Sequence, residues 1–114
     1  MPMFTAAMID DVRRVLDEAA IGKSQEQCFL TAYQVLDRMR DEYRNRLVEG
    51  TGALGGEGAG VQYSASSAVA AIMKTEQLKD IVETKYIDAQ SIQFQVAGQQ
   101  IRAGYCVCGI YRLR

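Results

Sequence analysis

The sequence predicts an α+β fold, with three N-terminal helices packed on a small C-terminal antiparallel sheet. Two observations carry this prediction. Apolar residues recur every three or four positions through most of the first 75 residues, which is the period of amphipathic helices. In the segment 92–97 the period changes to two, as in a strand with one buried face. Helices followed by strands, rather than alternating with them, indicate the α+β class.

The composition indicates one intracellular domain. The chain has 114 residues, 48% of them hydrophobic, which suits a single domain spanning 1–114. Its 13 Lys and Arg balance 14 Asp and Glu, so a protein built to bind polyanions is not favoured. The N-terminus has neither the basic nor the apolar part of a signal peptide, and no apolar run is long enough for a membrane span. We therefore predict a cytoplasmic protein that does not contact membranes.

The first helix is predicted over 5–20. Ile9, Val12 and Leu16 share one face of this segment, and charged residues take the other face. Gly22 follows as the expected stop, since glycine often ends a helix. These positions define the first amphipathic helix of the core.

The second and third helices are predicted on either side of a glycine-rich segment. Ser24 and Gln27 have the spacing of a capping box, and the second helix is expected to run unbroken from there to about Glu49. The third helix is predicted over roughly 66–75, where serines supply caps and Val69 and Ile72 supply an apolar face.

The strands follow in the last third of the chain. Alternation predicts a strand over 92–96, and an almost wholly apolar second strand, 105–113, is expected to lie centrally in the sheet. The segment 97–104 is interpreted as the hairpin connection between these two strands, with a short extra strand at 100–102. The segment 82–88 is a weaker candidate for an edge strand. The expected core contains Val12, Leu16, Phe29, Leu36, Val69, Ile72, Phe94, Val96 and Val107.

The glycine-rich loop at 50–60 holds six of the ten glycines. Gly50, Gly52 and Gly55 satisfy the spacing of the dinucleotide fingerprint, but that motif needs a strand before the glycines, and here a helix precedes them. A P-loop is also excluded, because no Lys follows until Lys74. We therefore predict a flexible connection between two helices.

A weaker hypothesis places an anion or small-ligand site where this loop meets the third helix. Free N–H groups at a helix start attract anions, and hydroxyl side chains can add hydrogen bonds. The residues of this candidate site, which uses the 50–66 loop and the helix start, are Gly58, Gly60, Ser64, Ser66 and Ser67.

No catalytic, cofactor-binding or metal-binding residue is predicted. The chain has no histidine, which removes the commonest general base. Cys28, Cys106 and Cys108 lack a second paired motif and are interpreted as small buried side chains in a reducing cytosol. Adjacent carboxylates such as Asp10 and Asp11 are expected to be solvated. We therefore predict that the protein is not an enzyme.

The order of elements resembles a winged-helix domain, in which the segment 66–75 would be the recognition helix and 97–104 the wing. That resemblance implies nucleic-acid binding. However, Lys74 is the only basic residue of the helix, so this function is an alternative and is not favoured. The stretches "FLTAYQVLDRM" and "VCGIYRLR" also resemble small uncharacterised bacterial proteins carried on mobile gene cassettes, a resemblance that implies no activity.

The last strand indicates self-association. Tyr105, Val107 and Tyr111 share one face of it, and Cys106, Cys108 and Ile110 share the other. Three helices readily cover only one face, so the other is either covered by a partner or left as an apolar patch. We predict a non-enzymatic binding or interaction module that forms a homodimer through its sheet, with Tyr105, Val107 and Tyr111 as candidate interface residues. The ligand is not identified.

Overall fold

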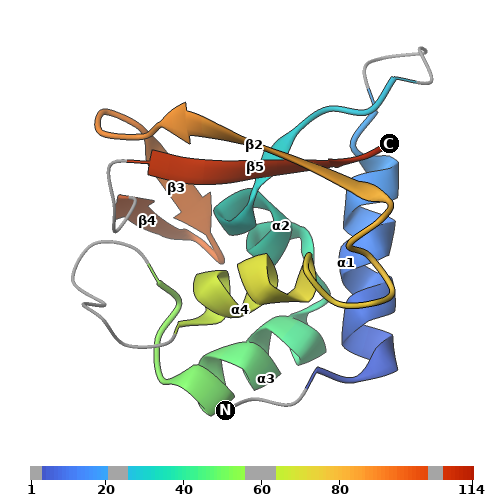
Figure 1. Ribbon diagram of the computed structural model, residues 1–114. Helices are drawn as coiled ribbons and strands as arrows, with labels where there is room; N and C mark the ends of the chain where they lie inside the picture. The colour runs from blue at the N-terminus through green and yellow to red at the C-terminus, as the bar shows by residue number, and fades with distance from the viewer. Residues whose placement is uncertain (1–3, 21–25, 56–63, 103–106) are drawn as a thin grey trace.

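Four helices lie on one side of a three-stranded antiparallel sheet, and a two-stranded hairpin packs beside them (Figure 1). This computed structural model describes residues 4–20, 26–55, 64–102 and 107–114. The helices are α1 (Ala6–Glu18), α2 (Ala32–Arg38), α3 (Asp41–Thr51) and α4 (Ala65–Ile72). The strands are β1 (Leu30–Thr31), β2 (Val82–Asp88), β3 (Gln93–Val96), β4 (Gln99–Arg102) and β5 (Val107–Leu113). The predicted α+β class is confirmed.

The first predicted helix is confirmed as α1. Thr5 caps it, because its hydroxyl oxygen accepts a hydrogen bond from the Met8 amide at 3.2 Å. Val12 and Leu16 are fully buried, as their spacing predicts. The helix ends at Glu18, before Gly22, which lies outside the described residues.

The second predicted helix is wrong in its start and its continuity. The structure places strand β1 first, and α2 begins only at Ala32. Thr31 and Gln34 form the capping box: the Gln34 amide donates to the Thr31 hydroxyl at 3.2 Å, and the Thr31 amide donates to the Gln34 side chain at 2.8 Å. The same signature recurs seven positions after the predicted one at Ser24, which lies outside the described residues.

The predicted helix is also divided in two, because the backbone at Met39 is extended between α2 and α3. Two guanidinium groups satisfy the carbonyl groups that this break leaves without helical partners. Arg44 donates to the Asp37 carbonyl at 3.0 Å, and Arg14 of α1 donates to the Arg38 carbonyl at 3.1 Å. The break between α2 and α3 therefore depends on side-chain contacts that a local helical pattern does not predict.

The three-stranded sheet has the order β1–β5–β2. The last strand is central and the segment 82–88 is an edge strand, so both predictions are confirmed. Leu30 of β1 and Tyr111 of β5 are paired and buried against the helices. Phe29, predicted in the core, has the opposite orientation and is only half-buried, with the guanidinium of Arg112 4.6 Å from its ring centre.

The predicted pairing of the strand at 92–96 with the last strand is wrong. The short extra strand expected near 100–102 is present as β4, and it pairs with β3 in a separate two-stranded sheet. The two residues between them, Ala97 and Gly98, both have positive φ, at 51° and 83°. A two-residue hairpin turn of the primed kind requires positive φ, so the chain reverses inside the predicted connection.

Replacing Ala97 by asparagine is expected to stabilise the protein by about 0.5–1 kcal/mol, because asparagine tolerates the left-handed region that costs alanine energy. Urea unfolding followed by circular dichroism measures the change. Ala97→Val is the matched control, since a β-branched side chain at positive φ is expected to destabilise the turn. Equal or reversed effects of the two substitutions would contradict the turn assignment.

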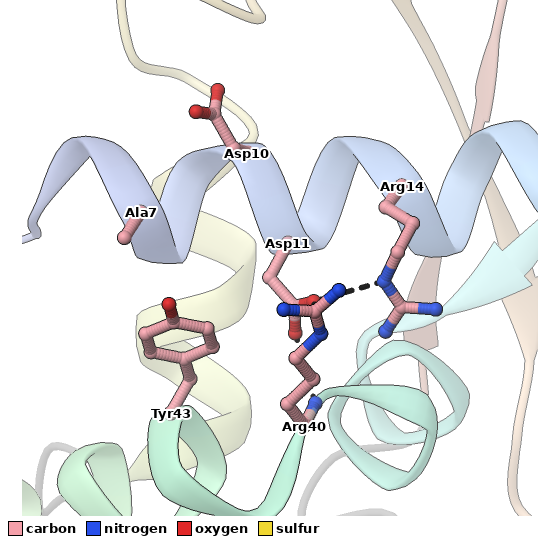
Figure 2. A pocket seen from close by; sticks show the side chains of 6 residues that line it. All are labelled: Ala7, Asp10, Asp11, Arg14, Arg40 and Tyr43. Carbon is pink, nitrogen blue, oxygen red and sulfur yellow. Dashed lines mark hydrogen bonds and ion pairs between the residues drawn. The ribbon is translucent and has the colours of Figure 1, made fainter.

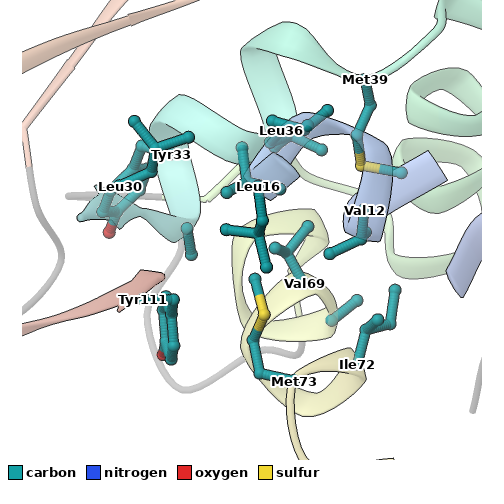
Figure 3. Close-up of a cluster of buried hydrophobic side chains, with 14 of the residues drawn as sticks. Val12, Leu16, Leu30, Tyr33, Leu36, Met39, Val69, Ile72, Met73 and Tyr111 are labelled. Carbon is teal, nitrogen blue, oxygen red and sulfur yellow. The ribbon is translucent and has the colours of Figure 1, made fainter. Parts of the chain in front are cut away.

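The core lies between the sheet and α1, α2 and α4 (Figure 3). Seven of the nine predicted core residues are buried; Phe29 and Val107 are not, and Val107 is 47% exposed. Val107 is the first residue of β5 and lies opposite Asp88, the last residue of β2.

The winged-helix arrangement is not confirmed. A recognition helix has to stand clear of the domain, whereas α4 is buried along most of its length, with Ala65, Ala68, Val69 and Ile72 fully buried. The helix contacts α2 on one side and α3 on another. Most of the surface of α4 is therefore packed in the core.

Candidate functional site

A pocket of about 160 Å³ lies between α4, the start of α2 and the first half of β5. It brings together residues that the sequence singled out for two separate reasons, the serines of α4 and the apolar residues of β5. None of the described residues that line it is charged. The lining residues are Ala32, Tyr33, Ser66, Ser67, Ala70, Val107, Cys108, Gly109 and Tyr111.

Gly109 shapes the floor of this pocket. A Cβ atom at this position would lie 2.6 Å from the hydroxyl oxygen of Tyr111, so any side chain would displace the phenol. The missing side chain lets the Tyr111 ring lie back along its own strand, where it is buried. Tyr111 therefore belongs to the core and the pocket wall, and Val107 at the pocket rim is the only candidate interface residue that the described part of the chain leaves exposed. Tyr105 lies outside it.

The opposite wall is held by an aromatic stack. The rings of Tyr33 in α2 and Phe94 in β3 lie nearly parallel, with their centres 4.8 Å apart. This contact fixes the Tyr33 ring between the hairpin and the pocket. Tyr33 lies four residues after Phe29, a spacing that predicts a shared helical face and gives no signal of a pocket.

The serines at the start of α4 form a hydroxyl cluster. Ser64 caps the helix, and its hydroxyl lies 3.2 Å from that of Ser66 and 3.0 Å from that of Ser67. Ser64 and Ser66 are buried, and Ser67 is exposed. Of these three serines, Ser66 and Ser67 line the pocket.

The amide groups on which the anion hypothesis depends are already hydrogen-bonded. Ala65 donates to the Ala53 carbonyl and Ser66 to the Leu54 carbonyl, each at 2.9 Å, and the Ser67 amide donates to the Ser64 hydroxyl. An anion at the start of α4 would have to displace these bonds. Two further residues of that candidate site, Gly58 and Gly60, lie outside the described residues.

Burial favours the neutral forms of the Cys108 thiol and the Tyr111 phenol. It raises the pKa of the Cys108 thiol, and burial is also the main cause of the raised pKa of the Tyr111 phenol, with smaller contributions from Cys108 and Tyr86. Both groups therefore stay protonated at neutral pH. The described lining of the pocket is therefore uncharged and combines hydroxyl-bearing residues with apolar surface.

Cys108 is accordingly expected to react slowly with alkylating reagents, because the thiolate is the reactive form and a raised pKa reduces its population. At pH near 8, iodoacetamide is expected to modify Cys108 at least about tenfold more slowly in the folded protein than in urea. Peptide mass mapping resolves the individual cysteines. Equal rates in the two states would show that Cys108 is accessible and ionised.

A second cavity, of about 220 Å³, lies between α1 and the junction of α2 with α3 (Figure 2). Asp11 is at its centre and is only 4% exposed, so the prediction that both adjacent carboxylates are solvated is wrong for Asp11. Asp11 accepts hydrogen bonds from the Arg14 side chain and the Arg40 amide, both at 2.9 Å. The hydrogen bond to Asp11 is the main reason that the pKa of Arg14 is raised.

In this second cavity, Asp11 joins α1 to the junction of α2 and α3. Asp11 also lies 3.6 Å from the Arg40 side chain, so the charge at its centre is already paired. Asp10 also lines this cavity, but its side chain points away from the carboxylate of Asp11. The spacing of Asp11 with the buried residues Met8, Val12 and Val15 is a signal in the sequence that could have identified it as buried.

In the densest basic stretch of the chain, the side chains of Arg40 and Arg44 make ion pairs within the fold, whereas Arg38 and Arg46 are exposed. Arg44 pairs with Asp41 and with the end of α2, and its side chain is mostly buried. Among the described residues, no group of three or more His, Cys, Asp or Glu side chains could hold a metal ion. Within the same residues, no helix has the length and apolar character that crossing a bilayer requires.

Comparison with known proteins identifies no relative: no family model, curated protein or solved structure matches this chain.

Proposed function

We propose that this protein is a non-enzymatic binding domain, and that the pocket between α4 and β5 takes a small uncharged ligand. One observation carries the proposal: three elements distant in sequence bring Tyr33, Ser66 and Tyr111 to one pocket, and none of the described residues in its wall is charged. A charged ligand would lose its hydration there without an opposite charge in return. An uncharged ligand with an apolar part and a hydroxyl or amide group matches both kinds of surface.

The volume limits the size of this ligand. Drug-sized molecules occupy pockets of about 300 Å³ or more, whereas this one has about 160 Å³. The pocket therefore suits a molecule of roughly ten non-hydrogen atoms or fewer, for which the attainable affinity is modest.

Binding is favoured over catalysis by the chemistry of the pocket. The Cys108 thiol is held in its protonated form, and the chain has no histidine to act as its base. Hydroxyl and thiol groups in this state donate and accept hydrogen bonds without attacking a substrate. The free thiols of Cys28 and Cys108 also support a cytoplasmic setting for this function.

The test is a screen of small neutral alcohols, amides and phenols against charged analogues of the same size, read by thermal shift and by ligand-detected NMR. We expect neutral members to bind and their acids and amines to bind at least about tenfold more weakly. Ala70→Leu adds bulk to the pocket wall and is expected to abolish binding. Ala71→Leu is the matched control, because Ala71 is the next residue of α4 and does not line the pocket.

Two outcomes would contradict the proposal. One is preferential binding of the charged analogues. The other is neutral ligands that bind Ala70→Leu as well as they bind the unmodified protein, which would place them elsewhere.

A further inference from the structure

The outer edge of β2 is open. Its inner edge pairs with β5, and no described strand pairs with the other edge. The Ile81 carbonyl accepts a hydrogen bond from the Arg114 amide at 2.9 Å, which fixes the direction of the backbone groups along this segment. Because these directions alternate in an antiparallel ladder, Val82, Thr84 and Tyr86 turn their N–H and C=O groups toward the open edge.

The side chains at this edge are also exposed. Thr84 and Lys85 are exposed, and Tyr86 is 70% exposed, which is unusual for a large aromatic residue in a strand. Val107, on the neighbouring strand, shares the sheet face of Tyr86 and is also exposed. The edge therefore combines unused backbone hydrogen-bonding groups with uncovered apolar surface.

We propose that a second copy of this chain adds its β2 to this edge, antiparallel, about a two-fold axis that passes between the two Thr84 residues. A two-fold axis that relates adjacent antiparallel strands is perpendicular to the sheet, so it keeps the helices of both copies on the same side. Directly opposed residues of antiparallel strands have their side chains on the same face of the sheet. The axis therefore has to pass between one residue of β2 and the same residue of the partner's β2. The candidate centres are therefore the residues of β2 themselves.

Charge complementarity selects Thr84 among these centres. With Thr84 on the axis, Glu83 lies opposite the partner's Lys85, and Lys85 lies opposite the partner's Glu83. With Lys85 on the axis, two lysines would face each other, and with Glu83 on the axis, two glutamates would do so. Like charges directly opposite each other are destabilising, so these two registers are disfavoured.

With Tyr86 on the axis, Glu83 and Lys85 do not face each other either, because Lys85 then lies opposite the partner's Ile87. In the Thr84 register, by contrast, Tyr86 lies opposite the partner's Val82, and aromatic with β-branched pairs are favourable across strands. In this register, the residues that turn their N–H and C=O groups toward the open edge, Val82, Thr84 and Tyr86, lie opposite one another. The two strands then form about six main-chain hydrogen bonds. The result is one continuous six-stranded sheet, β1–β5–β2 joined to its symmetry mate.

Charge reversal tests both the interface and its register. Glu83→Lys sets lysine against lysine twice in the homodimer, and Lys85→Glu sets glutamate against glutamate twice. Each variant alone is expected to dimerise at least about tenfold more weakly than the unmodified protein. A mixture of the two variants is expected to recover the affinity, because each mixed pair then brings opposite charges together.

Sedimentation velocity on the full chain, from about 1 to 100 micromolar, measures these affinities. Lys79→Glu makes the same charge change outside β2 and is expected to leave dimerisation unchanged. Circular dichroism confirms that each variant is folded, a necessary check because Glu83 also pairs with Arg112 at 2.8 Å. A monomer throughout this range would overturn the proposal. So would a dimer that neither single variant weakens, or single variants whose mixture does not recover.

Discussion

Replacing Asp11 by alanine is expected to lower the free energy of unfolding by about 1–3 kcal/mol, the usual cost of removing a buried carboxylate that accepts hydrogen bonds from a backbone amide and a charged side chain. Asp11 holds α1 to the junction of α2 and α3 through the Arg14 side chain and the Arg40 amide. Without its carboxylate, the Arg40 amide loses its acceptor and the arginines lose their buried counter-charge. Urea unfolding measures the difference.

Asp10→Ala is the matched control, because Asp10 is the adjacent residue of α1, has the same chemistry and is exposed. Its effect is expected to stay within about 0.5 kcal/mol, as is usual for surface substitutions. Similar effects of the two substitutions would mean that the junction does not depend on the Asp11 carboxylate.

Replacing Gly55 by alanine is expected to destabilise the protein by about 3–4 kcal/mol, through two additive causes. Gly55 has a φ of 124°, which side chains rarely adopt, and an added Cβ would lie 2.0 Å from the Ser66 hydroxyl oxygen. Ser66 is buried, and the added Cβ would also lie 2.9 Å from the Cβ of Ser66, so rotation of the hydroxyl alone would not remove the overlap. The strained backbone and the overlap therefore both act on the folded state.

Gly52→Ala separates these two causes. Gly52, the C-cap of α3, also has a positive φ, at 89°, but a Cβ there would meet no atom within 4 Å. We expect it to cost about 1–2 kcal/mol from the backbone alone. Thermal and urea unfolding of both variants give the comparison. If Gly55→Ala were no worse than Gly52→Ala, the close contact between Gly55 and Ser66 would be disproved.

The sequence was sufficient to predict elements that depend on local periodicity. The spacing of Val12 and Leu16 predicted α1, and the alternation around Phe94 predicted β3. The nearly continuous apolar run of the last strand correctly predicted its central place in a sheet. Each of these signals is produced by residues within one element, whose buried faces impose the period.

The break between α2 and α3 could not be predicted in the same way. The groups that stabilise it include Asp11 and Arg14, which belong to another helix and approach only in the folded chain. The pairing of β3 with β4 was missed for a different reason. Ala97 adopts a positive φ that its residue type does not suggest, so the turn carried no asparagine or aspartate as a signal.

The candidate site was predictable only in its parts. Ser66 and Ser67 were selected for their place at a helix start, and Val107 and Tyr111 for their place on an apolar strand. Their meeting in one pocket depends on the packing of α4 against β5, which no local pattern contains.

The central position of β5 has a consequence for biosynthesis. Its partners are β1, from the first third of the chain, and β2, and the Leu30–Tyr111 pair joins residues separated by most of the sequence. A nascent chain that has emerged only through β4 therefore holds Leu30 and Val82 without the strand that joins them. Contacts of such long sequence separation slow folding and lengthen the exposure of apolar surface. This protein is expected to fold only after β5 has left the ribosome, and until then to be a natural client of chaperones that bind nascent chains.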